Sequence, residues 1–403
     1  MMHKRFAALL ALALMLIALP ALAQAQEAQE ITTQCTITAN GKKAKTAPML
    51  DRDYTTYYIL KKGGYMEVEC QEEAIGGLFL QCYDRPTSFD IQVEQGGEWT
   101  TVDHGGTHLT DWFPLPEGTR RVRIVNTAKA RMFLAELTVY GTGSQPFNAP
   151  RWEDYDKADM MLVVAHPDDE LLWFGGLLPT YAGERGLRVQ VLYLVASTPQ
   201  RRLELLDGLA HCGVKGYPAF AGMRDVYSNS LKAQYKRWNK NSLLEKVTAF
   251  VRQYRPEVLV TQDFNGEYGH GAHRVAADIC SLAVKAAAKE NKYKKSVKLY
   301  GTWQVKKLYV HLYEENSVQM DWYQPLSAFG GKDGMTVAKE ALACHKSQVK
   351  HGWAMEEGGE NDNTLFGLYF TCVGEDTARN DIMEHIALDG GSSVLSGAGA
   401  LGE

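Results

Sequence analysis

The chain has no excess of positive charge and no basic stripe. Its 403 residues include 43 Lys and Arg against 48 Asp and Glu, a formal net charge of −5 at pH 7. Proteins that bind nucleic acid usually present clustered Lys and Arg on one face. The one short lysine cluster here, at residues 291–295, has the composition of a solvated loop. We therefore expect no nucleic-acid partner.

Long apolar runs are missing after residue 23, because no later segment approaches the roughly 18 apolar residues that a membrane-spanning helix needs. Residues 1–23 have the pattern of a signal peptide. Lys4 and Arg5 precede an apolar stretch, Pro20 ends it, and Ala-Leu-Ala at 21–23 is a small-residue cleavage site. A retained N-terminal anchor is the alternative, and Pro20 and the cleavage pattern argue against it. We expect a secreted or extracytoplasmic protein with no membrane span after signal cleavage.

Cysteine is sparse and lacks the spacing of metal ligands. An odd count of seven allows at most three disulfides, and buried free thiols are an equal alternative. None lies in the polar motifs described below. The seven are Cys35, Cys70, Cys82, Cys212, Cys280, Cys344 and Cys372.

The first third of the chain alternates apolar and polar residues at a period of two, which is typical of β-strands. Turn residues separate these segments, and the pattern predicts an all-β sandwich over residues 30–141. A linker rich in Gly, Pro and small polar residues follows at 142–150. The predicted strands are 65–70, 89–93, 120–125 and 134–140.

From residue 151 to 389, apolar strands alternate with amphipathic helices, which favours a parallel sheet with right-handed crossovers. We predict a Rossmann-like α/β domain, with a mostly parallel sheet and helices on both faces. The Gly-, Ser- and Ala-rich tail 390–403 is predicted to be disordered. The predicted strands are 161–165, 187–196, 258–263 and 307–313, and the predicted helices are 171–185, 200–212, 241–254, 275–289 and 335–349.

The segment 161–170 reads Met-Leu-Val-Val-Ala-His-Pro-Asp-Asp-Glu, a buried strand that ends on one imidazole and three carboxylates. An N-cap Asp and an acid in the first helical turn account for two of the acids without any chemistry. They do not account for His166 and the third acid. The cluster therefore indicates a metal site with a base beside it.

A second strand ends in polar residues far downstream, where 261–274 reads Thr-Gln-Asp-Phe-Asn-Gly-Glu-Tyr-Gly-His-Gly-Ala-His-Arg. In a parallel sheet both loops lie at the carboxyl ends of strands, where open α/β folds place their sites. His270 and His273 can point into one pocket from a helix start. Catalytic zinc usually takes three His or carboxylate ligands and keeps one position open.

These two motifs, in this order, resemble those of the PIG-L (LmbE-like) family of zinc-dependent N-acetylglucosaminyl deacetylases. The resemblance covers roughly residues 159–348. Two shorter segments agree with it: Arg201-Arg-Leu-Glu204, and His345-Lys-Ser-Gln348 near the family's C-terminal end.

The resemblance implies that His166, Asp169 and His273 bind Zn²⁺. It also implies that Asp168 is the general base and that His270 assists the developing oxyanion. The remaining two residues, Arg201 and Tyr268, then face the substrate. The chemistry agrees with this division, because amide hydrolysis needs an activated water, a charge near the oxyanion and a carboxylate that moves the proton.

One position departs from the family pattern. Many relatives have an acid just before the last histidine, whereas this chain has Gly271-Ala272. Such an acid would orient or charge the neighbouring imidazole, so its absence leaves the protonation state of His270 open. Glu267 or Asp263 can replace it, although we favour ordinary loop solvation for each.

The N-terminal segment resembles discoidin-like, galactose-binding-like domains at residues 51–56, 98–100, 112–116 and 133–140. Such domains often bind sugars through aromatic residues on loops, which implies a further glycan partner. The alternative is that Trp99, Trp112 and Phe113 belong to the core, which is the commoner place for an aromatic side chain.

We expect an exported zinc amidohydrolase. The resemblance implies that it removes acetyl from an N-acetylated amino sugar, such as N-acetylglucosamine in a glycan or glycoconjugate. One alternative is hydrolysis of another small amide at the same metal. A second is a non-catalytic glycan-binding protein. The complete set of five motif residues argues against loss of turnover: His166, Asp168, Asp169, His270 and His273.

Overall fold

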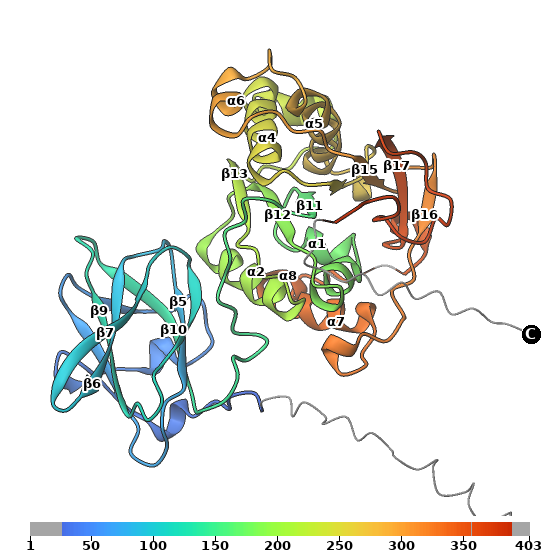
Figure 1. Ribbon diagram of the computed structural model, residues 1–403. Coiled ribbons are helices and arrows are strands. Elements are labelled where there is room, and N and C mark those ends of the chain that lie inside the picture. The colour runs from blue at the N-terminus through green and yellow to red at the C-terminus, as the bar shows by residue number, and fades with distance from the viewer. Residues whose placement is uncertain (1–25, 356, 389–403) are drawn as a thin grey trace, which may run out of the picture.

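The structure, a computed structural model, describes residues 26–355 and 357–388 (Figure 1). The predicted signal peptide 1–23 and the predicted disordered tail 390–403 lie outside the described residues. In the part of the chain that is described, no helix is both long and apolar enough to cross a membrane.

The N-terminal part folds into two antiparallel sheets, as the alternating pattern predicts. One has the strand order β2-β1-β4-β9-β6-β7 and the other β3-β10-β5-β8. The sequence pattern misses β5 because all six of its residues are buried, so it has no alternation. The strands are β1 Thr36–Ala39, β2 Lys42–Lys43, β3 Tyr58–Leu60, β4 Tyr65–Glu69, β5 Gly77–Cys82, β6 Phe89–Gln95, β7 Glu98–Gly105, β8 Thr110–Pro114, β9 Arg121–Asn126 and β10 Met132–Tyr140.

The three aromatic residues singled out in this region lie in different places. Trp112 and Phe113 in β8 are 4% and 1% exposed, so their assignment to the core is confirmed. Trp99 in β7 is half-buried, and the guanidinium carbon of Arg123 lies 3.9 Å from its ring centroid. All seven cysteines, Cys35 and Cys372 included, are free thiols.

The C-terminal part is a mixed α/β fold around a seven-stranded sheet of order β13-β12-β11-β14-β15-β17-β16. The first five strands are parallel, and β17 and β16 complete the sheet in antiparallel pairing. The sheet is therefore mostly parallel, as predicted. The strands are β11 Met160–Val164, β12 Val189–Val195, β13 Ala219–Met223, β14 Val258–Thr261, β15 Lys307–His311, β16 Ser317–Gln319 and β17 Leu365–Thr371.

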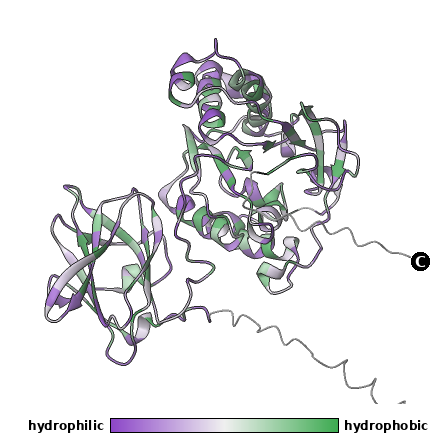
Figure 2. Ribbon diagram, in the orientation of Figure 1, coloured by the Kyte–Doolittle hydropathy of each residue, from purple (hydrophilic) through white to green (hydrophobic). Residues whose placement is uncertain are grey.

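Helices cover both faces of this sheet (Figure 1). Alternate residues of β11 face opposite sides: Leu162 belongs to the apolar cluster under α1 and α2, and Val163 to the cluster under α4 and α5. The hydropathy colouring places apolar residues in the strands and polar ones on the outer helix surfaces (Figure 2). The helices are α1 Asp169–Leu172, α2 Pro199–His211, α3 Leu231–Arg237, α4 Lys240–Tyr254, α5 Gly271–Ala287, α6 Lys294–Tyr300, α7 Gly334–Leu342 and α8 Lys346–Val349.

Two predicted helices are wrong in extent. The helix 171–185 is broken into α1 and a π-helical turn, Pro179–Glu184, because Gly175 has a φ of +51°. The chain also packs closely there, since a Cβ on Gly176 would lie 2.9 Å from the Trp322 side chain. The helix 335–349 is split into α7 and α8 just before His345, whose buried ring faces Glu170 at 3.0 Å.

The two parts of the chain pack directly against each other along α2. Asp207 of α2 is half-buried and accepts hydrogen bonds from the hydroxyl of Tyr54 and from Nε2 of Gln81, the latter at 3.0 Å. Further along the contact, the rings of His108 and Tyr217 stack with centroids 4.4 Å apart. The sandwich therefore contacts the same helix that carries Arg201.

Candidate metal centre and active site

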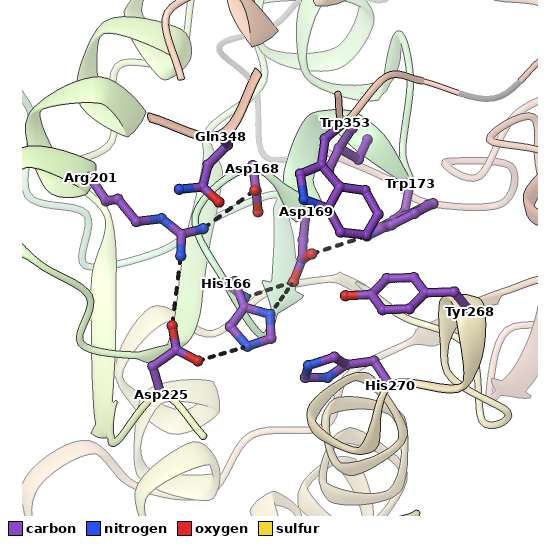
Figure 3. Close-up of a pocket in the computed structure, with 11 residues that line it drawn as sticks. His166, Asp168, Asp169, Trp173, Arg201, Asp225, Tyr268, His270, Gln348 and Trp353 are labelled. Carbon is purple, nitrogen blue, oxygen red and sulfur yellow. Dashed lines mark hydrogen bonds and ion pairs between the residues drawn. The ribbon is translucent and has the colours of Figure 1, made fainter. Parts of the chain in front are cut away.

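Neighbouring parallel strands bring the two polar motifs together. β11 and β14 pair in parallel, so the residues that follow Val164 and Thr261 lie at the same carboxyl edge of the sheet. The backbone N–H of Ala165 donates to Oε1 of Gln262 at 2.8 Å, which ties the two loops. Figure 3 shows the pocket formed there.

The first loop makes a strained turn at Asp168. Its φ is +112°, a conformation that is rare for a residue other than glycine and that persists only where the surroundings hold it. The N–H of Asp168 donates to Oε2 of Glu170 at 2.8 Å. The Asp168 side chain makes no cap hydrogen bond and instead lies 3.3 Å from Arg201, so helix capping does not account for this acid.

The three predicted ligands converge beside this turn. Nδ1 of His166 lies 3.3 Å from Oδ2 of Asp169, and Nε2 of His273 lies 3.3 Å from Oδ1. Two ligand atoms that are each about 2.0–2.1 Å from a tetrahedral Zn²⁺ are about 3.3 Å apart. His166, Asp169 and His273 are only 7%, 3% and 0% exposed, and each histidine nitrogen lies at this spacing from a different oxygen of Asp169.

Glu267 orients His273 from behind. It is fully buried and accepts hydrogen bonds from Nδ1 of His273 at 2.8 Å and Nδ1 of His311 at 2.7 Å. Burial alone raises the pKa of Glu267, but these two histidines outweigh it and lower the pKa to about 2. Nε2 of His273 then has no hydrogen-bond partner and points to Asp169. The interpretation of Glu267 as a solvated loop residue is wrong, because the carboxylate holds a ligand ring in place.

His270 caps α5 and faces the same cluster. Its Nδ1 accepts a hydrogen bond from the N–H of Ala272 at 3.1 Å, so a neutral ring has its proton on Nε2. Burial, with His273 and His166 nearby, lowers the pKa of His270 to about 3. The ring is therefore neutral, which answers the question that Gly271-Ala272 raised.

The side chains of His166, His270 and His273 are an alternative ligand set, since one nitrogen from each lies within 4.8 Å of the others. Ligation by Nε2 of His270 would require its proton to move to Nδ1, which would break the hydrogen bond from Ala272. One oxygen of Asp169 lies 3.3 Å from Nδ1 of His166 and the other lies 3.3 Å from Nε2 of His273. The hydrogen bond from Ala272 argues against His270 as a ligand.

The pocket beside these residues has a volume of about 160 Å³. Arg201 and Tyr268 both line it, as predicted. Trp173, Asp225 and Trp353 also line it, and no motif in the sequence indicates them. The full lining is His166, Asp168, Asp169, Leu172, Trp173, Arg201, Asp225, Tyr268, His270, Gln348 and Trp353.

Comparison with known proteins agrees with this geometry. Residues 161–284 match the family model described as "PIG-L: GlcNAc-PI de-N-acetylase". This segment is a PIG-L family domain.

Two relatives in Rhodococcus share the description "1D-myo-inositol 2-acetamido-2-deoxy-alpha-D-glucopyranoside deacetylase". The protein of Rhodococcus opacus (strain B4) is 28% identical over 260 residues, which cover 56% of this chain and 80% of that protein. The protein of Rhodococcus jostii (strain RHA1) is 27% identical over 230 residues, covering 50% and 70%.

Among solved structures, the N,N'-diacetylchitobiose deacetylase from Pyrococcus horikoshii is 16% identical and has a TM-score of 0.37. The likeness covers 47% of this chain and 71% of that one. At this TM-score it says nothing about the activity of this chain.

The two shorter motifs of the PIG-L domain and its C-terminal continuation meet in space. Glu204 of α2 accepts a hydrogen bond from the N–H of Ser347 at 3.0 Å. Nε2 of His345 lies 3.0 Å from Oε1 of Glu170, the residue that holds the Asp168 backbone. These contacts place Gln348 at the pocket wall.

The surroundings of Asp168 suit a proton acceptor. Burial and the neighbouring Asp169 raise the pKa of Asp168 above its usual range, while Arg201 opposes the rise. A general base works best with a pKa near the working pH. Arg201 also donates to the carbonyl of Pro167 at 2.5 Å, which fixes the guanidinium beside the carboxylate.

Proposed function

We propose that this protein is an exported, zinc-dependent hydrolase that removes acetyl from an N-acetylglucosamine-type unit of a glycan or glycoconjugate. The PIG-L match and the names of the relatives support deacetylation of such a substrate. His166, Asp169 and His273 converge beside a further carboxylate, Asp168, which is not one of the three predicted ligands. This observation carries the proposal. Export is supported by the signal-peptide pattern of residues 1–23.

The residues present fit a metal ion. Nε2 of His273 is a buried nitrogen beside Asp169, and Glu267 accepts from Nδ1–H on the other side of the ring, so Nε2 can hold a metal ion in place of a proton. Two imidazoles and one carboxylate are ligands typical of catalytic zinc, which keeps a fourth position open. When bound, Zn²⁺ supplies positive charge that polarises the carbonyl and lowers the pKa of a water to about 7.

Two residues of the chain then handle protons and charge. Asp168, which is not a ligand, takes a proton from the attacking water and donates it to the leaving amine. Nε2–H of His270 donates a hydrogen bond to the carbonyl oxygen as negative charge develops on it. The raised pKa of Asp168 and the neutral ring of His270 match these roles.

The pocket has one polar and one aromatic side, which suits a sugar ring. Arg201 and Asp225 offer hydrogen bonds on one side. On the other, the ring centroid of Tyr268 lies 5.2 Å from that of Trp353 and 5.7 Å from that of Trp173 (Figure 3). We assign these aromatic side chains to the apolar face of the sugar.

Glycan binding by the sandwich is a further part of the proposal and is supported by the resemblance to discoidin-like domains alone. Trp112 and Phe113 are buried, although Trp112 also lines a hollow of about 570 Å³ in the sandwich. Trp99 is the one of the three aromatic residues that reaches the surface.

The proposal competes with two others. A non-catalytic glycan-binding protein would not need the strained turn at Asp168, whose cost is of order 1–3 kcal/mol. Hydrolysis of a different small amide would use the same metal and base, and the aromatic wall formed by Trp173, Tyr268 and Trp353 favours a sugar over it.

Acetate release by the zinc-loaded protein tests the proposal. The substrates are free N-acetylglucosamine, N-acetylhexosamine oligomers, peptidoglycan fragments and a simple acetamide. We expect release from at least one N-acetylated sugar. Release from the acetamide alone would support the small-amide alternative, and no release from any substrate would contradict catalysis.

A further inference from the structure

A second hollow lies beside the catalytic pocket along the same edge of the sheet. It has a volume of about 860 Å³, and Tyr268 lines both hollows. Its lining comes from the segments that follow β14 and β15, from the first residues of β16 and β17, and from the loop around Asn361. We call it the β15 groove.

We propose that the β15 groove binds a second sugar unit, so that the enzyme acts on an acetylated unit within an oligosaccharide. This inference rests on the proposed function and specifies its substrate. The catalytic pocket, at about 160 Å³, is smaller than ligand sites of roughly 300–1,000 Å³, whereas the groove lies within that range. In a substrate longer than one sugar, the acetylated unit occupies the pocket and the next unit occupies the β15 groove.

The backbone around the groove is strained in the way that marks ligand sites. Tyr268 and Leu312 both line it and have φ values of +45° and +58°, which are uncommon for residues other than glycine. The N–H of Tyr268 donates to Oδ1 of Asn361 at 3.4 Å, and this contact joins the two sides of the groove. Such strain is kept where the surroundings impose it, and it is concentrated at binding sites.

The groove also has the side chains that sugars require. The rings of Tyr268 and Tyr313 offer apolar surface, and Asn265 and Arg274 offer hydrogen-bond donors for hydroxyl groups. Tyr268 is 45% exposed, so its ring is open to a ligand that spans both hollows.

The charged side chains that line the β15 groove indicate which class of second sugar unit it binds. Three carboxylates, Asp263, Glu314 and Glu360, face one guanidinium, that of Arg274. This excess of negative charge disfavours a phosphorylated or uronic-acid unit and accepts a neutral or cationic one. The reaction itself converts a neutral acetamide into an amine that takes up a proton. The groove therefore suits an N-acetylated unit or one that is already deacetylated.

The test fills the groove without altering the catalytic pocket. Ser317 is an exposed residue at the start of β16, and Ser317→Trp places a large ring in the groove. We compare kcat/KM for an N-acetylglucosamine disaccharide with that for the monosaccharide. The ratio should fall about tenfold, which corresponds to the loss of one or two hydrogen bonds. Thr100→Trp, at an exposed position of β7, is the matched control and should keep the wild-type ratio.

Measuring the affinity for the disaccharide distinguishes failure of this inference from failure of the proposed function. The zinc-loaded protein carrying Asp168→Asn is titrated in a calorimeter, and the disaccharide should bind to it more tightly than the monosaccharide. Adding Ser317→Trp should lower the affinity for the disaccharide about tenfold. If the disaccharide binds in this way but no sugar is hydrolysed, the proposed function fails and the groove stands. If the disaccharide has no advantage over the monosaccharide, or Ser317→Trp leaves its binding unchanged, the inference is overturned.

A charge variant tests the class of the second unit. Glu314→Gln combined with Glu360→Gln should reduce the affinity for a disaccharide with a deacetylated second unit by a larger factor than the affinity for the fully acetylated one. Raising the salt concentration should act in the same direction, because exposed charges are screened. Tighter binding of a uronic-acid disaccharide than of the neutral one would contradict the charge argument.

Discussion

The two ends of β15 each touch a buried cluster of charges, and the clusters differ in one respect. At the amino end, Lys307 donates to Asp376 and, at 2.8 Å, to the carbonyl of Glu384, and the hydroxyl of Tyr309 also donates to Asp376. At the carboxyl end, His311 donates to Glu267, which also holds His273. Nε2 of His273 is left without a hydrogen-bond partner, whereas each group of the amino-end cluster has one.

The comparison shows that buried charge alone does not mark a functional site. Lys307 and His273 are both fully buried and both lie beside a carboxylate. Only the second cluster has a buried imidazole nitrogen without a hydrogen-bond partner, and a carboxylate oxygen lies 3.3 Å from that nitrogen. A buried polar atom without a hydrogen-bond partner needs an explanation, and at His273 we propose that a metal ion supplies it.

The largest effect is expected at Asp168, which we propose as the proton acceptor beside the metal. Asp168→Asn removes the proton acceptor, so kcat should fall by about 10²–10⁴-fold with metal content unchanged. Steady-state kinetics and elemental analysis of the same preparation check this. Full activity in the variant would mean that another residue is the base.

Glu267→Gln should have the next largest effect, because it weakens the group that orients a ligand. Loss of such a partner typically lowers metal affinity by about 10–100-fold. Competition with a chelator measures it. The control is Glu257→Gln, which alters a buried carboxylate paired with Lys157 and Lys306 at the amino end of β14. Equal losses in both variants would indicate a general effect on the fold.

Trp353→Ala probes a wall of the pocket that carries no charge. Loss of one aromatic contact is worth about 0.5–1.5 kcal/mol, so KM should rise by up to about tenfold while kcat and metal content change little. Trp353→Phe should restore most of the loss, and Tyr323→Ala, at another exposed aromatic residue, is the control. An unchanged KM would remove Trp353 from substrate binding.

Lys307→Met should leave metal content and kcat unchanged. The variant leaves Asp376 buried and unpaired, which typically destabilises a protein by about 3–5 kcal/mol. Thermal unfolding should therefore show a lower Tm than the wild type. Loss of zinc without loss of stability would mean that the two clusters do not differ as we describe.

The sequence predicts most of the site because its residues lie in two short motifs that follow apolar runs. Strand ends place His166 and His273 together, and parallel pairing of β11 and β14 confirms the expected sheet edge. The role of Glu267 is considered in the sequence but not favoured, because His311, its second partner, lies 44 residues away and has no motif around it. Trp353 is missed because it lies in a loop that has neither a motif nor a periodic pattern.

The errors in the fold have a similar origin. The helix 171–185 reads as continuous from its apolar spacing, but Gly175 and Gly176 break it to pack against Trp322. Such breaks depend on contacts between segments that are far apart in the chain. A local pattern cannot contain this information.

Metal content of two variants tests the central claim most directly. Asp169→Asn should lose its zinc, because a neutral amide oxygen is a poorer ligand than a carboxylate. His270→Ala should keep about one zinc per chain, because its proposed role is to stabilise the oxyanion. Both variants are compared with the wild type by elemental analysis after identical dialysis. Zinc lost from His270→Ala but kept by Asp169→Asn would show that the three histidines hold the ion, and would contradict our account of the site.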